Sequence, residues 1–166
     1  SFTVEDDRVT VSLSTAAGNL HAGGPAVDDE GNITYALSIT NPSNESLTGA
    51  YAKVLVHDQA DTSHANDFYA YGSLSGANPT VSIAASEAMH GKSYTVTLVD
   101  IVNGNNDGAT TLTNNADSGN GIGADFVVAS HVNSGDPIVA DSFTVEDDRV
   151  TVSLSTAAGN LHAGGP

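Results

Sequence analysis

The amino-acid sequence predicts an all-β protein, a sandwich of two sheets built from about seven short strands. Three observations lead to this prediction. Apolar and polar residues alternate with a period of two in a series of short runs. Turn-forming Gly, Asn, Asp and Pro residues separate these runs. No stretch carries the 3.6-residue apolar periodicity of an amphipathic helix, apart from a single helical turn expected at 84–90.

The first two strands each alternate throughout their length. The first is expected at 9–14, where Val9, Val11 and Leu13 alternate with hydroxyl residues. The second is expected at 32–40, which ends in an Asn-Pro-Ser-Asn turn. Both patterns are typical of strands with one face in a core and the other in water.

Five further runs are rich in β-branched or aromatic residues and lie next to turn signals. In order they are residues 47–56, 68–71, 80–83, 92–99 and 125–129. Together with the first two they make seven strands, which fits an immunoglobulin-like β-sandwich of one domain.

The most informative feature of the chain is an exact internal repeat. Residues 1–25 recur without a single change as residues 142–166, an offset of 141 residues. Folding constraints alone do not preserve turn and surface residues in this way, and long-period identity is typical of tandem arrays. We therefore interpret residues 1–141 as one repeat unit. Residues 142–166 are then either the start of the next unit or a donor strand, so the first strand is duplicated at the C-terminus.

A lone strand must pair with a sheet or leave its apolar face and backbone groups exposed. Residues 26–141 form a single body and should offer one groove for the duplicated strand, yet the chain carries two copies. We expect one copy to fill the groove of its own chain and the other that of a neighbouring unit. The residues predicted to form this polymer interface are Val9, Val11, Leu13, Val150, Val152 and Leu154.

Composition excludes several classes of function. The chain has 20 acidic and 4 basic side chains, a net charge of −16, and such a surface repels nucleic acids and anionic membranes. Membrane insertion is not expected, because no apolar run of about 18 residues is present. Cysteine is absent, so disulfides, thiolate nucleophiles and cysteine metal sites are excluded.

A resemblance supports the predicted fold. Residues 32–41 followed by residues 46–58 resemble the strand–turn–strand hairpin of immunoglobulin-like tandem repeats in bacterial and archaeal surface or filament proteins. The high content of Gly, Asn, Ser, Thr and Ala is common in such repeats. The resemblance implies a β-sandwich repeat at the cell surface or outside the cell, and it implies no catalytic residues.

The acidic segment after residue 102 contains candidate calcium ligands. Oxygen-bearing side chains occur at every second position before Gly108, the spacing by which calcium loops bring oxygens together. A second group of oxygen-bearing side chains, at positions 117, 120 and 125, lies among glycines. The alternative is that Asn, Asp and Gly simply form turns here. The candidate ligands are Asn103, Asn105, Asp107, Asp117, Asn120 and Asp125.

Histidines offer a weaker metal hypothesis and no catalytic one. His57 and His64 bracket Asp58 and Asp61, a loose set of transition-metal ligands that could equally be solvated loop residues. No GxSxG, HExxH or phosphate-binding glycine motif is present, and we expect no enzymatic activity.

Two functional hypotheses remain. The first is a structural subunit of an extracellular filament or surface fibre, its units joined head to tail through the repeated strand, by strand complementation or as a covalent tandem array. The alternative is an adhesin-type binding module that recognises glycan or protein. The expected partners are neighbouring copies of the chain, and calcium is the only cofactor expected.

Overall fold

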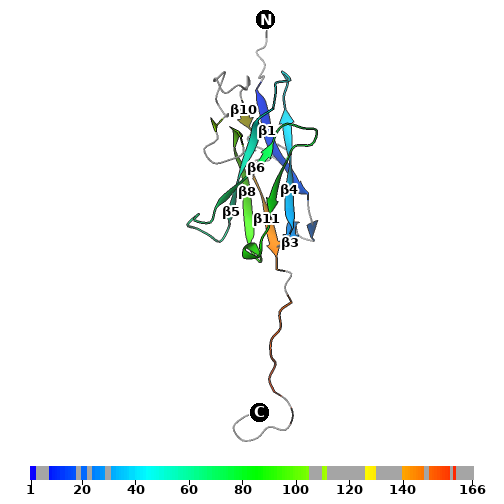
Figure 1. Cartoon of the computed structure of the whole chain (residues 1–166), viewed down its shortest axis with the longest axis vertical. Coiled ribbons are helices and arrows are strands. Elements are labelled where there is room, and N and C mark those ends of the chain that lie inside the picture. The colour runs from blue at the N-terminus through cyan, green and yellow to red at the C-terminus, as the bar shows by residue number, and fades with distance from the viewer. Residues whose placement is uncertain are drawn as a thin grey trace.

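The computed structural model describes residues 1–2, 8–17, 20–21, 24–28, 31–104, 110–111, 126–129, 140–147, 150–157 and 159. These residues form strands β1–β11 and one turn of 3-10 helix, η1 (Glu87–Met89), which lies within the helical turn predicted at 84–90. The strands belong to two sheets (Figure 1). The prediction of an all-β protein with two sheets is therefore confirmed.

The smaller sheet has four strands in the order β10-β1-β4-β7. β1 lies between β4, with which it runs antiparallel, and β10, with which it runs parallel. The bounds of these strands are β1 (Val9–Ala17), β4 (Asn32–Thr40), β7 (Thr80–Ala84) and β10 (Phe126–Val128).

The larger sheet has seven strands, six of them in the order β2-β3-β11-β8-β5-β6, and β9 also pairs with β8. Its last strand in the sequence, β11, runs antiparallel to β8 and parallel to β3. The bounds are β2 (Leu20–His21), β3 (Gly24–Asp28), β5 (Ala50–Asp58), β6 (Phe68–Ser73), β8 (Ser93–Asn103), β9 (Thr110–Thr111) and β11 (Ala140–Glu146).

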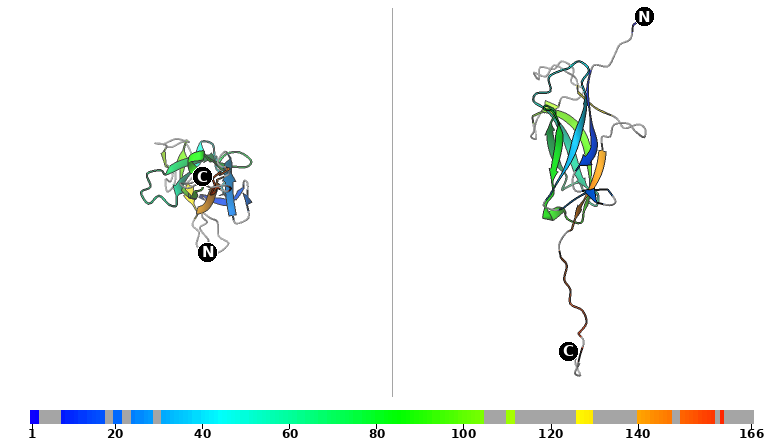
Figure 2. Two further views of the ribbon diagram at one scale, coloured as in Figure 1. Left: turned by 90° about the horizontal axis from the view of Figure 1, so that it is seen from below. Right: turned by 90° about the vertical axis from the view of Figure 1, so that its right-hand side faces the viewer.

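The body is elongated, and the chain passes from one end of it to the other. β1 begins near one end of the long axis, and β11 ends at the opposite end (Figure 1). Residues 150–157 continue away from that end along the same axis. The side view in Figure 2 shows the same arrangement.

The core lies between the two sheets and follows the period-two pattern. Along β5, buried and half-buried residues alternate at every position, and β4 and β7 alternate in the same way over most of their length. One irregularity interrupts β8, where Leu98 pairs with Val54 but Asp100 pairs with Lys53. Val99 is therefore an extra bulged residue, and its side chain is 42% exposed. The bulge resets the alternation so that Ile101 points into the core again.

The predicted strands largely coincide with observed ones. The bounds of 32–40 are confirmed by β4, and the runs at 68–71, 80–83, 92–99 and 125–129 correspond to β6, β7, β8 and β10. The run predicted at 47–56 begins later, at Ala50, because residues 47–49 form a turn. The strands β2, β3, β9 and β11 were not predicted.

The hairpin interpretation of residues 32–58 is wrong. β4 pairs with β1 and β7, whereas β5 pairs with β6 and β8 in the other sheet. The segment 41–49 therefore carries the chain from one sheet to the other. Alternation specifies that each strand has a buried face, but it does not specify which strand forms hydrogen bonds with which.

Candidate functional site

Strand β1, which lies in the middle of the N-terminal copy, contributes side chains to the core. Val9 and Val11 in β1 are completely buried, and Leu13 is 2% exposed. The backbone of β1 pairs with β4 and β10, and the N–H of Ala129 donates to the carbonyl of Val11 at 2.9 Å. These three side chains belong to the hydrophobic core of the chain's own body.

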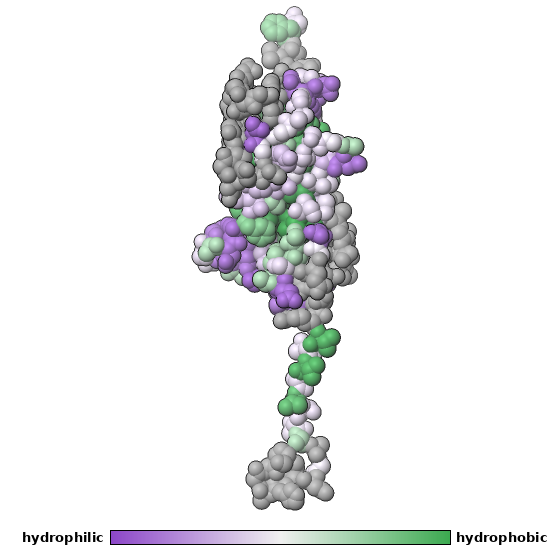
Figure 3. Space-filling view, viewed as in Figure 1, coloured by the Kyte–Doolittle hydropathy of each residue, from purple (hydrophilic) through white to green (hydrophobic). Residues whose placement is uncertain are grey.

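The same residues in the C-terminal copy are exposed. Val150, Val152 and Leu154 are 90%, 86% and 100% exposed, and residues 150–157 pair with no strand of the described structure. Figure 3 shows hydrophobic residues spaced along the extended segment beyond the body. Identical sequence therefore adopts two environments, one in the core and one in solvent.

The second residue of the repeat shows the opposite assignment. In the C-terminal copy, Phe143 is 1% exposed and Val145 is completely buried, both in β11, whereas Phe2 of the N-terminal copy is 90% exposed. The ring of Phe143 stacks on Tyr94 at 5.4 Å between centroids. The Val145 N–H donates to the backbone carbonyl of Lys92 at 2.9 Å, which connects β11 to the residue just before β8.

The repeated segment thus contributes to more than one strand, and two of them, β1 and β11, carry its buried apolar side chains. Its first five residues form the last strand of the body, and its continuation from Val9 forms the first. Between the end of β11 at Glu146 and the copied start of β1 at Val150 lie only residues 147–149. Residue 141, after which the sequence predicted a unit boundary, lies within β11, and the core residues Phe143 and Val145 follow it in the same strand.

The candidate calcium ligands are placed only in part. Asn103 is the last residue of β8 and its side chain is exposed. Asn105, Asp107, Asp117, Asn120 and Asp125 lie outside the described residues. The calcium hypothesis therefore stays a prediction from the sequence.

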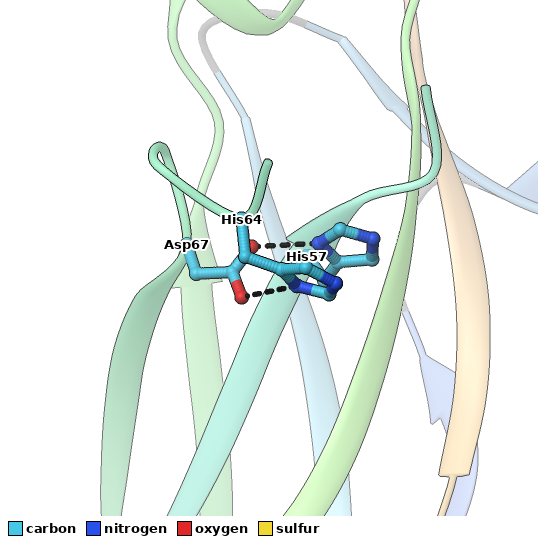
Figure 4. A group of neighbouring side chains, drawn as sticks. All are labelled: His57, His64 and Asp67. Carbon is cyan, nitrogen blue, oxygen red and sulfur yellow. Dashed lines mark hydrogen bonds and ion pairs between the residues drawn. The ribbon is translucent and has the colours of Figure 1, made fainter. Parts of the chain in front are cut away.

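A second group of side chains gathers at the hairpin between β5 and β6. His57 comes from β5, and His64 and Asp67 come from the loop that follows (Figure 4). The Nδ1 atom of His57 lies 2.6 Å from Oδ1 of Asp67, and the Nδ1 atom of His64 lies 2.9 Å from Oδ2. The two imidazole rings stack with their centroids 4.0 Å apart.

The structure brings the two histidines together, but with Asp67 in place of Asp58 and Asp61. Asp58 follows His57 in β5 and therefore points to the other face, where its carboxylate accepts from the Ala60 N–H and faces Lys92 Nζ at 3.5 Å. Asp61 accepts from Ser63 and Asn66 within the loop. Asp67 lies next to the two histidines because the loop turns back toward β5. Sequence spacing alone does not reveal this contact.

Hydrogen bonding favours the ionised form of both loop carboxylates. The bond from His57, followed by the bond from His64, lowers the pKa of Asp67 below its usual value. The side chain of Ser63, with further bonds from Asn66, lowers the pKa of Asp61 to about 2. Because an ionised carboxylate only accepts hydrogen bonds, both Nδ1 atoms that face Asp67 must carry protons in this state.

Comparison of the chain with protein-family models, with curated proteins and with solved structures found no match. Within the described ranges, no helix has the length and apolar character that a membrane span requires.

Proposed function

We propose that this chain is a structural unit of an extracellular filament or surface fibre, in which successive units are joined head to tail through the repeated segment. The observation that carries this proposal is the division of the repeat into two core strands. Phe143 and Val145 close one unit, and the residues that follow them are identical to those that open it, Val9, Val11 and Leu13. Each copy therefore fits the junction between a unit that ends and a unit that begins.

Covalent continuity accounts for the two copies more simply than strand exchange. β1 already occupies the position between β4 and β10, so a donated strand would have to displace an identical one. In a continuous chain, β11 of one unit instead runs on into β1 of the next. Val150, Val152 and Leu154 then become buried in the second unit without displacing anything.

The geometry supports an extended fibre. β1 starts near one end of the body and β11 finishes at the other (Figure 1). Glu146 and Val150 are four residues apart and can be separated by at most about 14 Å, so successive units would lie close together. Tension along such a fibre loads β1 and β11 lengthwise, against rows of hydrogen bonds that run across the strands. The immunoglobulin-like character and the location outside the cell are parts of this proposal.

The proposal predicts the shape of a longer chain. A protein that contains two complete units should be a stiff rod whose maximum dimension in small-angle X-ray scattering is close to twice that of one unit. Electron microscopy should show beads in line. A two-unit chain whose units fold back on each other, or tumble independently, would contradict the fibre model. Saturable binding of a glycan or protein by a single unit would favour the adhesin alternative.

A further inference from the structure

We propose that His57, His64 and Asp67 form a binding site for one divalent transition-metal ion, with Zn²⁺ as the best fit. The ligands would be Nδ1 of each histidine and a carboxylate oxygen of Asp67. This inference is independent of the proposed fibre function, because the three residues lie on the β5–β6 hairpin, apart from the repeated segment.

The three donor atoms are already close enough to share an ion. All of them lie within 4.8 Å of one another. Zinc binds imidazole nitrogen and carboxylate oxygen at about 2.0–2.2 Å, so two tetrahedral ligands lie roughly 3.3 Å apart. The nitrogen–oxygen distances of 2.6 and 2.9 Å are shorter because protons bridge them. Replacing the two Nδ1 protons by a metal requires these distances to lengthen by roughly 0.4–0.7 Å. Because an imidazole binds a metal in the plane of its ring, one of the two stacked rings must also turn, and the exposed His64 side chain is free to do so.

The donor types select the class of metal. Two imidazoles and one carboxylate suit Zn²⁺, Co²⁺, Ni²⁺ or Cu²⁺, whereas Ca²⁺ and Mg²⁺ prefer oxygen ligands only. Three protein ligands leave the remaining coordination position for water. His64 has a side chain that is 60% exposed and gives an ion access from solvent, while His57 and Asp67 are 19% and 16% exposed.

The loop holds these ligands in position before any ion binds. His64 adopts a left-handed backbone conformation, with φ of 59°, which turns the chain so that Asp67 follows on the same side. The Asp67 N–H donates to the His64 carbonyl at 3.3 Å. The backbone N–H of Asn66 donates to the carboxylate of Asp61 at 3.2 Å. Because the loop is already turned, binding requires only side-chain reorientation and loses less conformational freedom than ordering the loop would. The net charge of −16 also raises the local concentration of cations.

Calorimetric titration of the full 166-residue chain with Zn²⁺ tests the site. We expect one saturable ion per chain, and Co²⁺ in the same position should give the strengthened visible absorption of tetrahedral coordination. His64→Asn should lower the affinity at least tenfold, because asparagine tolerates the left-handed backbone but removes the imidazole. Asp67→Asn should do the same. A hundredfold excess of Mg²⁺ should not displace the ion.

His90→Asn is the matched control, because it removes a histidine outside the cluster and should leave the affinity unchanged. Circular dichroism of each metal-free variant shows whether it is folded. If Asp67→Asn does not fold, His64→Asn decides the question alone. The proposal is overturned if His64→Asn binds Zn²⁺ as tightly as the unaltered chain, or if His90→Asn weakens binding as much. It is also overturned if Mg²⁺ competes at equal concentration.

Discussion

Phe143→Ala is expected to lower the free energy of unfolding by about 3–5 kcal/mol, the usual cost of emptying a buried phenylalanine site. Phe2→Ala, the same change at the same position of the other copy, should alter it by less than about 0.5 kcal/mol. The difference follows from their environments, because Phe143 is 1% exposed in β11 and Phe2 is 90% exposed.

The second half of the repeat should show the reverse asymmetry. Leu13→Ala removes a core side chain and should cost about 2–5 kcal/mol, whereas Leu154→Ala at a fully exposed position should cost almost nothing. Urea denaturation of the four variants measures all of these effects. Equal effects at Phe2 and Phe143, or at Leu13 and Leu154, would show that the two copies exchange places in solution.

Shortening the chain should have an even larger effect, and its onset should be sharp. A chain that ends at residue 139 lacks β11 and with it Phe143, Val145 and the strand that pairs with both β8 and β3. Burial of each apolar side chain contributes roughly 1.5–3 kcal/mol, a large fraction of the about 5–15 kcal/mol that stabilises an ordinary domain. We expect this chain to be unfolded or aggregated, with loss of its cooperative thermal transition.

A chain that ends at residue 147 is the control. It keeps β11 and loses residues 148–166, of which the described ones, 150–157 and 159, pair with no strand. Its melting temperature should equal that of the 166-residue chain within a few degrees. A stable fold for the chain that ends at residue 139, or a marked loss of stability for the chain that ends at residue 147, would contradict the assignment of β11 as the closing strand.

The strands could be predicted because alternation is a local property. β4 begins and ends where the sequence indicates, since its apolar residues repeat at every second position and a turn follows. The phase of the repeat could not be predicted in the same way. Residues 142–146 and residues 150–154 both alternate, and nothing in their letters shows that one half closes a unit while the other half opens one. Only the burial of Phe143 and Val145 separates them.

Contacts between residues that are distant in sequence could not be predicted either. The hairpin interpretation was wrong because strand pairing depends on how the chain crosses between sheets, which alternation does not encode. The His57–His64–Asp67 group could be predicted only in its histidines. Asp58 and Asp61 are nearer in sequence, but strand alternation turns Asp58 away and Asp61 binds its own loop. Proximity in sequence was a poor guide to proximity in the site.

The location of the unit boundary changes how the chain is understood. With a boundary after residue 141, the C-terminal copy is a surplus strand that needs a foreign groove. In the proposed fibre, β11 is the closing strand and the copy is a junction, so that the part from Val150 onward would belong to a second unit. The exposed Val150, Val152 and Leu154 would then be core residues of that unit.

Hydrogen exchange at residues 150–157 tests this central claim most directly. The comparison is between the 166-residue chain and a chain that continues through a second complete unit. Peptides that begin before Ser142 and extend past Leu154 occur only at the junction, so mass spectrometry distinguishes them from the N-terminal copy. In the 166-residue chain, the amides of residues 150–157 should exchange freely. In the two-unit chain they should be slowed at least about a thousandfold, as in a domain stable by about 5 kcal/mol. Free exchange of residues 150–157 in both chains would contradict the account.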